Sequence, residues 1–323
     1  MEIALSFLQG FGDVNSGRKQ QVSRCKSVRR RRKFVVAASS IDDELGMEQK
    51  QRFYESVVAV EGDLQLFEAL MCISDGEKKR IDLDYHRNQM DAWSRELSSL
   101  VRKDNGDPFR QLGVVNQFFF DELGFRLAGN DDFYNPDNSL IDEVMRTRIG
   151  IPISLCAIYR ELCHRATDLR LEGINFPAHF LLRLRSPHIY IDPAQPEKAL
   201  LRRSDLQGML DKYFPDQPVA LSEDMLRVVD EKEIVIRVLR NLKTAYLKAN
   251  QNEEALSVMD RLVLISPTTA GERRDRGLLL HIMGRRKRCV QDLEFFVALE
   301  KNNPDSVVLR ALISRYRNQP DEQ

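Results

Sequence analysis

Residues 148–193 constrain the fold most strongly, because they predict one helix followed closely by two strands. Pro152 suits the first turn of a helix, where its fixed φ is favourable and its missing N–H is not needed. The apolar runs at 180–184 and 189–191 predict two short strands. Residues 186–187 form a turn between them, so we expect the strands to pair antiparallel beside the helix.

Three polar residues mark the ends of these elements: Ser154 near the helix start, His179 before the first strand and Asp192 after the second. This is the order of a nucleophile, a base and the residue that orients the base. Asp192 follows His179 by 13 residues, enough for a strand, a turn and a paired strand, so we expect the two to be neighbours. The candidate catalytic residues are therefore Ser154, His179 and Asp192. The alternative is structural: Ser154 caps the helix or packs, His179 is a satisfied buried histidine and Asp192 ends a strand.

Cys156 is an alternative nucleophile, because a thiolate is stabilised near a helix N-terminus. It lies about 200° around the helix from Ser154, so we expect it to face elsewhere. Its i, i+7 spacing to Cys163 instead predicts a core stripe. His164, on the same helix, is expected at the surface.

The five cysteines form no CxxC pair and the five histidines are dispersed. The sequence therefore predicts reduced core cysteines, no metal site and no cofactor.

The first 40 residues have the composition of an organelle transit peptide. They hold nine basic and two acidic residues and end in an apolar and serine-rich run. We expect cleavage near residues 36–38 and a location in the chloroplast stroma, with the mitochondrion as the alternative. A second interpretation is a basic arm at 29–33, for nuclear import or nucleic acid.

The whole chain has 49 basic and 49 acidic residues, so residues 41–323 carry 40 basic and 47 acidic ones. This acidic balance gives no reason to expect nucleic-acid binding. The hydrophobic content of 42% predicts a globular protein, and no apolar run reaches the ~18 residues of a membrane span.

Residues 231–317 predict a helical block with an internal repeat of 34 residues, the period of tetratricopeptide repeats. Asn250 and Gly284 occupy equivalent turns of the two units. Two units are fewer than usually stand alone, so we expect them to pack on the preceding domain. The matched pairs are Ala245 with Leu279, Tyr246 with Leu280, Asn250 with Gly284, Ala255 with Cys289, Leu256 with Val290, Met259 with Leu293, and Leu262 with Phe296.

The part of the chain before this centre is predicted to be helical, with a turn at 74–76 and a break at 105–108. The segment 129–139 is dense in turn formers and predicts an ordered loop. Its asparagines are expected to satisfy local backbone groups, and the alternative is that this loop lines a cleft with His179.

An ordered set of motifs resembles the SirB-type transglutaminase-like family over roughly residues 55–320. The resemblance implies a helical N-terminal part, a small antiparallel sheet against the Ser154 helix, and a helical tail. It implies no known reaction, and it places Ser154 where transglutaminase-like folds normally carry the catalytic cysteine. Ala178 departs from the glycine that the family more often has before its histidine, and it would crowd a close backbone approach. The motifs lie at 116–126, 129–130, 134–139, 148–154, 172–173, 176–182 and 191–193.

The predicted fold is α+β, with a transglutaminase-like (papain-like) core and an all-α tail. The expected divisions are the transit peptide at 1–40, a helical region at 41–105, the transglutaminase-like core at 106–225 and tetratricopeptide-like repeats at 226–323.

Three functions fit this arrangement. The first hypothesis is a non-catalytic protein that binds a protein or peptide partner in the groove of its repeats, as an assembly or regulatory module. The second is a serine-dependent amidase, peptidase or acyltransferase that uses Ser154, His179 and Asp192. The third is a scaffold that binds nothing specific.

Overall fold

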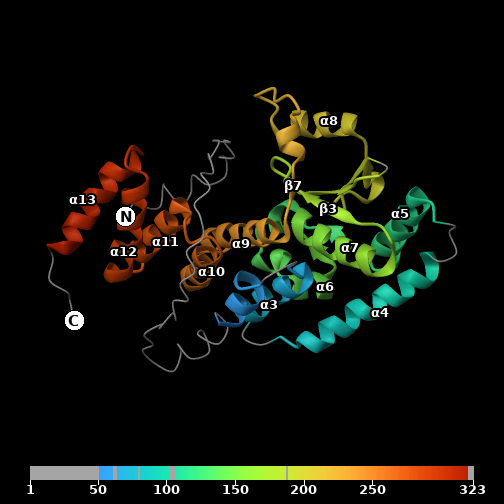
Figure 1. Cartoon of the computed structure of the whole chain (residues 1–323), viewed down its shortest axis with the longest axis horizontal. Helices are drawn as coiled ribbons and strands as arrows, with labels where there is room; N and C mark the ends of the chain where they lie inside the picture. The colour runs from blue at the N-terminus through green and yellow to red at the C-terminus, as the bar shows by residue number, and fades with distance from the viewer. Residues whose placement is uncertain (1–50, 61–63, 79–80, 102–105, 187, 319–323) are drawn as a thin grey trace.

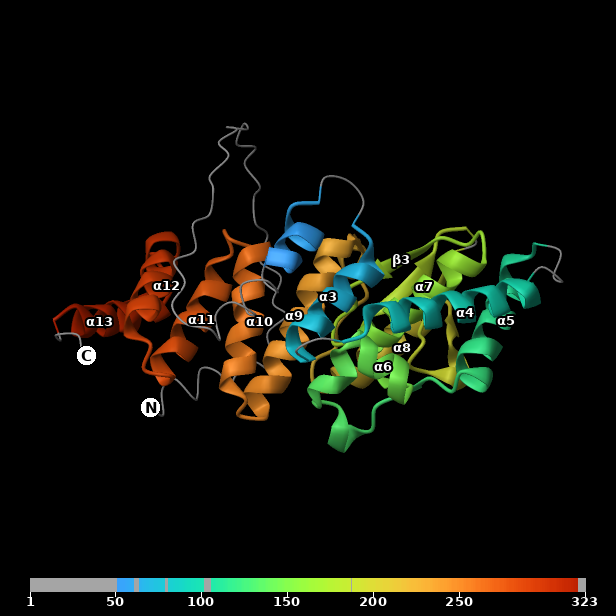
Figure 2. The same ribbon diagram turned by 90° about the horizontal axis from the view of Figure 1, so that it is seen from below.

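The computed structural model describes residues 51–60, 64–78, 81–101, 106–186 and 188–318. The predicted transit peptide at 1–40 lies outside these residues. The described chain is elongated, with a sheet and its covering helices at one end and a row of helices at the other (Figures 1 and 2). The α+β fold class predicted from the sequence is confirmed.

The N-terminal part is helical, as expected, but the predicted turn at 74–76 is wrong because these residues lie inside a helix. A Cβ on Gly76 would lie 2.0 Å from Nη2 of Arg261, so glycine here makes room for that arginine. The elements are η2 (Tyr54–Val58), α3 (Leu66–Lys78), α4 (Leu83–Val101), α5 (Pro108–Gln117) and η3 (Phe118–Glu122).

The predicted ordered loop at 129–139 contains two short 3₁₀ turns and leads to a short helix. A two-stranded parallel pair then brings residue 126 beside residue 149. These elements are β1 (Arg126–Leu127), η4 (Asn130–Asp132), η5 (Pro136–Ser139), α6 (Ile141–Thr147) and β2 (Ile149–Gly150).

A five-stranded antiparallel sheet forms the core, in the order β6-β5-β4-β3-β7. The predicted antiparallel pair is confirmed, with Leu182 opposite Ile191 and Leu184 opposite Ile189. The strands are β3 (Leu171–Ile174), β4 (Leu181–Leu184), β5 (Ile189–Ile191), β6 (Leu200–Leu201) and β7 (Val228–Val229), with the 3₁₀ turns η6 (Pro196–Lys198) and η7 (Glu223–Leu226) between them.

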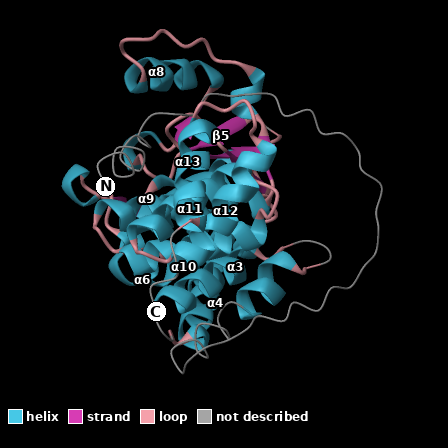
Figure 3. Ribbon diagram, turned by 90° about the vertical axis from the view of Figure 1, so that its left-hand side faces the viewer, coloured by secondary structure: helices cyan, strands magenta, loops and turns pink. Residues whose placement is uncertain are grey.

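Helices cover both faces of this sheet because successive strand side chains point to opposite faces. Leu182 and Leu184 join the main core with α7 (Pro152–Ala166), the predicted helix that begins at Pro152. Leu181 lies in a second core with α8 (Arg203–Tyr213). Figure 3 shows α8 on the side of the strands away from the other helices.

The tail consists of five helices, and the predicted block at 231–317 is confirmed. Asn250 and Gly284 have φ of 58° and 74°, so the equivalent turns of both repeats contain a residue in the left-handed backbone conformation. The helices are α9 (Glu231–Lys248), α10 (Asn252–Ile265), α11 (Ala270–Ile282), α12 (Arg286–Leu299) and α13 (Asp305–Arg317). In each turn a backbone N–H donates to the carbonyl five residues back at 2.9 Å: Gln251 to Tyr246 and Arg285 to Leu280.

The tail packs on the preceding domain, as the small number of repeats predicts. Arg261 of α10 is 2% exposed and forms a buried ion pair with Glu77 of α3. Lys248 at the end of α9 lies over the ring of Tyr134, with 3.1 Å between Nζ and the ring centroid. The main apolar core runs from Phe53 to Ile313, so both regions share one interior.

Candidate functional site

The N-terminus of α7 fixes the side chain of Ser154, which is 1% exposed. Its Oγ accepts the N–H of Ile151 at 3.0 Å and donates to the carbonyl of Asn138 at 2.7 Å. Such a contact to the residue before a helix satisfies one of the backbone groups that the helix leaves unpaired. A Cβ on Gly150 would come within 2.7 Å of Ser154 Oγ, so the pocket around the hydroxyl is already filled.

A tight turn presents His179 at the start of β4. The N–H of His179 donates to the carbonyl of Phe176 at 3.0 Å, across Pro177 and Ala178. Ala178 has φ of 56°, and a proline followed by a residue with positive φ is the pattern of a type II turn. A glycine at this position would adopt that φ without a steric penalty.

His179 and Asp192 form a buried pair, with 2.9 Å between Nε2 and Oδ2. The side chain of His179 is 6% exposed and that of Asp192 is fully buried. Asp192 is held in turn by the N–H of Ala194 at 3.0 Å and by the amide of Gln195 at 2.6 Å. These donors satisfy the carboxylate as a hydrogen-bond acceptor, and the structure therefore orients the imidazole firmly.

Nδ1 of His179 is hydrogen bonded to Tyr213, a residue that was not predicted from the sequence to belong to the site. The hydroxyl of Tyr213, at the end of α8, lies 3.2 Å from His179 Nδ1, and the two rings stack at 5.7 Å. With Asp192 accepting at Nε2, the contacts assign the proton to Nε2 and make Nδ1 the acceptor for Tyr213. Burial, together with the Asp192 carboxylate, raises the pKa of Tyr213 above its usual value, so the phenol stays protonated as the donor.

Cys156 points toward the strand that follows His179. Its Sγ lies 3.5 Å from the carbonyl of Phe180, and the thiol is fully buried. The expected separation of Cys156 and Ser154 around the helix is present, but the cysteine side faces the sheet and the serine side faces η5. Burial raises the pKa of the Cys156 thiol well above its usual range, and Asp192 raises it further, so the thiolate is disfavoured.

The three candidate residues therefore separate into a pair and a single residue. His179 and Asp192 are hydrogen bonded, whereas within the described residues no hydrogen bond joins Ser154 to His179. The loop at 129–139 meets Ser154 through Asn138, and no hydrogen bond links its described residues to His179. The local sequence gives no sign that Tyr213 belongs to this site, because its contact with His179 depends on how α8 packs against the sheet.

Two surface pockets, of about 440 and 400 Å³, lie elsewhere. The first is lined by residues that include Arg52, Asp75 and Arg87, and the second by residues of β3, β7 and the start of α9. Over the ranges that the structure describes, no three His, Cys, Asp or Glu side chains gather as a metal site. None of the helices in the described part of the chain is both long and apolar enough to cross a membrane.

Known proteins resemble the chain over both regions. Residues 84–240 match the transglutaminase-like superfamily and residues 242–314 match the tetratricopeptide repeat. A UPF0162 protein of Xylella fastidiosa (strain 9a5c) is 30% identical over 253 residues, which cover 76% of this chain and 88% of that protein. A UPF0162 protein of Vibrio cholerae is 29% identical over 265 residues, covering 81% and 93% respectively.

Protein SirB1 of Salmonella typhimurium is 29% identical over 223 residues, which cover 68% of this chain and 79% of that protein. No solved structure gives a significant match. The order of the domains, the helix–strand–strand centre and these matches together show that the chain belongs to the SirB1/UPF0162 family, with a transglutaminase-like domain followed by tetratricopeptide repeats.

Proposed function

We propose that this protein binds a protein partner and keeps the frame of a transglutaminase-like domain without using it for chemistry. The observation that carries the proposal is the occupation of both ring nitrogens of His179, by Asp192 and by Tyr213. A general base needs one nitrogen free to take a proton from the nucleophile. Here the hydroxyl of Tyr213 is bonded to Nδ1, the nitrogen that would otherwise be free to accept that proton.

The two candidate nucleophiles also argue against chemistry. The hydroxyl of Ser154 donates to a backbone carbonyl of the η5 turn, and its hydrogen-bond partners among the described residues are backbone groups, with no base among them. The thiol of Cys156 is buried, with its pKa raised well above the usual range. An activated nucleophile requires an adjacent base or a lowered pKa, and neither condition is met.

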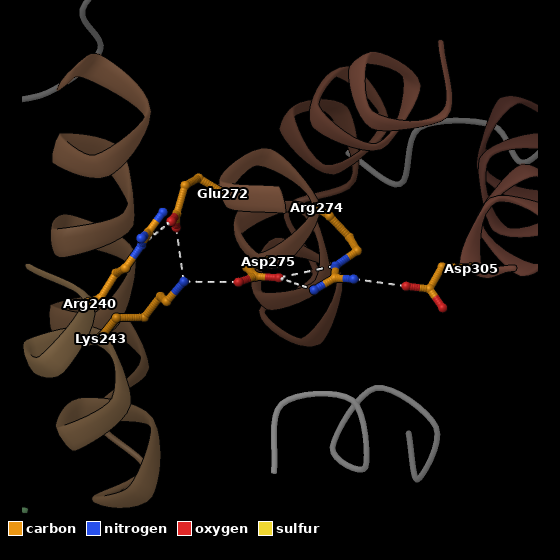
Figure 4. A network of polar contacts seen from close by, with 6 residues as sticks. All are labelled: Arg240, Lys243, Glu272, Arg274, Asp275 and Asp305. Carbon is orange, nitrogen blue, oxygen red and sulfur yellow. Dashed lines mark hydrogen bonds and ion pairs between the residues drawn. The ribbon is translucent and has the colours of Figure 1, made fainter. Parts of the chain in front are cut away.

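The tail supplies the surface on which we expect the partner to bind. Stacked helical repeats present an extended surface, and tetratricopeptide repeats of this kind suggest a protein interaction. A charged network runs across α9, α11 and α13 (Figure 4). Its most exposed member is Arg240, whose side chain is 49% exposed. The members are Arg240, Lys243, Glu272, Arg274, Asp275 and Asp305.

A reactivity test addresses the absence of chemistry. The full chain would be treated with a fluorophosphonate and, separately, with iodoacetamide, alongside Ser154→Ala, Cys156→Ala and His179→Ala variants. We expect the wild type to be labelled at residues 154 and 156 no faster than the His179→Ala chain. Labelling of Ser154 that depends on His179 would overturn the proposal.

A capture experiment addresses the binding surface. Wild-type and Arg240→Glu chains would be immobilised and incubated with chloroplast stroma. Arg110→Glu, at an exposed residue of α5, is the matched charge reversal. We expect a defined partner that is retained by the Arg110→Glu chain and lost by the Arg240→Glu chain. Equal capture by all three chains would argue against this surface, and no capture by any would favour an inert scaffold.

The alternative function is a serine-dependent amidase, peptidase or acyltransferase that uses Ser154, His179 and Asp192. The observation in its favour is the buried pair of His179 and Asp192, which has the form of a base with its orienting carboxylate. It requires Ser154 to leave Asn138 and Tyr213 to leave His179. His179-dependent labelling of Ser154 in the reactivity test would support it.

The plastid location is proposed from the basic composition of residues 1–40 alone. A fluorescent protein fused after residue 60 is expected to enter chloroplasts. Mitochondrial or nuclear fluorescence would replace this assignment with one of the two alternatives stated for this segment.

A further inference from the structure

Arg148 occupies a corner made by two aromatic rings, apart from His179 and from the tail. Its guanidinium carbon lies 4.3 Å from the ring centroid of Trp93 and 5.2 Å from that of Phe125. The two rings are nearly perpendicular, at 89°, and both residues are buried. Cation–π contacts of this kind hold a guanidinium by its face and leave its N–H edge free for another group.

No carboxylate of the described residues forms an ion pair with this guanidinium. Several other partly buried arginines have one, as Arg160 does with Glu231 and Arg183 with Glu172. Arg237 instead donates to the side-chain oxygen of Asn175. Nη1 of Arg148 is buried without a hydrogen-bond partner, and the other guanidinium nitrogens make no hydrogen bond in the described part of the chain. A buried donor without a partner destabilises the folded protein, so an acceptor supplied from outside would be favoured.

The backbone at Arg148 is held in a conformation that a side chain rarely adopts. Its φ is 64°, at the end of α6, where its N–H donates to the carbonyl of Val144 at 2.9 Å. Its own carbonyl accepts the N–H of Arg126 at 2.9 Å. Backbone strain of this kind at a non-glycine residue tends to mark functional positions.

One face of α4 completes the surroundings. Tyr85, Gln89 and Trp93 follow one another at intervals of four residues and so lie along one stripe. Tyr85 is 58% exposed. Gln89 Oε1 is buried, and no group of the described residues donates a hydrogen bond to it. The stripe therefore offers an exposed aromatic ring and an unused acceptor beside an unused cation.

We propose that Arg148, seated on Trp93 and Phe125, binds a carboxylate of a peptide. One positive charge matches a monoanion, and the planar N–H edge of a guanidinium fits the two oxygens of a carboxylate. A peptide also carries the N–H group that Gln89 needs, and Tyr85 can cover its apolar part. This site is separate from the tail surface proposed above, so either can fail without the other.

Trp93 makes the test direct, because the chain has one tryptophan. Its emission would be followed while the full chain is titrated with acetyl-Ala-Ala-Glu-amide and with acetyl-Ala-Ala-Ala bearing a free carboxyl end. The corresponding Gln and amidated peptides serve as uncharged controls, and inorganic phosphate as a second anion. We expect a saturable change with at least one carboxylate peptide and none with its uncharged counterpart.

Variants assign the binding to the residue. Arg148→Met keeps the aliphatic stem and is expected to weaken binding at least about tenfold, as the loss of a charged hydrogen bond implies. Arg126→Met removes a neighbouring exposed charge and is expected to change binding by less than about twofold. Circular dichroism shows whether the variants fold, and the wild-type comparison of charged with uncharged peptides stands without them.

Three results would overturn the proposal: equal responses to charged and uncharged peptides, unchanged binding by a folded Arg148→Met chain, or a response to phosphate alone. A response to the glutamate peptide or to the free carboxyl end supports it and tells which carboxylate is taken.

Discussion

Nδ1 of His179 and the hydroxyl of Tyr213 lie 3.2 Å apart, although 34 residues separate them in the chain. The contact fastens the end of α8 to the turn before β4. It also completes the hydrogen bonding of an imidazole whose other nitrogen already faces Asp192.

Replacing Tyr213 by Phe should expose Nδ1 while keeping the stacked ring. We expect a loss of stability of about 1 kcal/mol, the usual worth of one hydrogen bond, and faster modification of His179 by diethyl pyrocarbonate. Peptide mass spectrometry would follow the modification, with Tyr134→Phe, at an exposed position, as the control. Equal rates in all three chains would contradict the assigned contact.

Replacing Ala178 by Gly should stabilise the protein. Ala178 has φ of 56°, and a left-handed conformation costs a residue with a Cβ about 1–2 kcal/mol, of which the greater entropy of unfolded glycine cancels part. Urea unfolding is expected to give a gain of about 0.5–1 kcal/mol. Ala69→Gly, inside α3, is expected to lose about 1 kcal/mol. A destabilised Ala178→Gly chain would mean that this turn does not hold the positive φ.

Replacing Lys243 by Met should destabilise the tail strongly. Lys243 is 8% exposed and bridges Glu272 and Asp275 at 2.9 Å each, so its loss takes a shared cation from two buried carboxylates. Each carboxylate keeps one arginine, Arg240 or Arg274. The expected cost is about 3 kcal/mol or more, measured by urea unfolding. Adding Glu272→Gln to Lys243→Met should recover part of it.

The matched control for Lys243 is Arg240→Met, in the same network but half exposed. Its expected cost is below about 1 kcal/mol because solvent screens the pair. Similar losses for the two variants would show that burial does not set the strength of this network.

His164 should make stability depend on pH. The predicted surface position of His164 is wrong: the side chain is half-buried, and its Nε2 accepts the N–H of Leu171 at 2.8 Å. Burial, aided by the charges of Arg160 and Arg170, lowers the pKa of His164 to about 4. The unfolded chain takes up the proton at a higher pH than the folded one, so stability falls as pH falls from about 6.5 to about 4.

His164→Gln keeps an acceptor for Leu171 without a titrating group. Urea midpoints across this pH range should therefore vary less than in the wild type. His188→Gln, at an exposed position, should leave the pH dependence unchanged. A wild-type slope that survives in His164→Gln would assign the effect to other groups.

Local patterns predicted the elements around the site well. Pro152 begins α7, the apolar run at 189–191 is β5, and the offset of 34 residues pairs Asn250 with Gly284 in conformation as well as in position. Each of these features depends on neighbouring residues: a proline at a helix start, a strand between turns, and a left-handed residue between two helices.

Contacts between distant segments were beyond such patterns. Ser154 has the position of a nucleophile, but its hydroxyl is taken up by Ile151 and Asn138. The sequence around Gly76 is typical of a turn, yet Gly76 lies inside α3. A glycine is needed there because a Cβ would collide with the buried Arg261 of α10. Both outcomes depend on side chains that arrive from elsewhere in the chain.

The ion pair between Glu77 and Arg261 has a consequence during synthesis, since 184 residues separate its members. At about 5–20 residues per second, the ribosome needs roughly 10–40 s to make the second partner after the first. During that interval Gly76 and Glu77 of α3 lack the arginine that packs against them in the finished protein. A nascent or terminated chain that ends between residues 229 and 261 would therefore expose this part of α3 to chaperones and proteases, even though every strand of its sheet is already made.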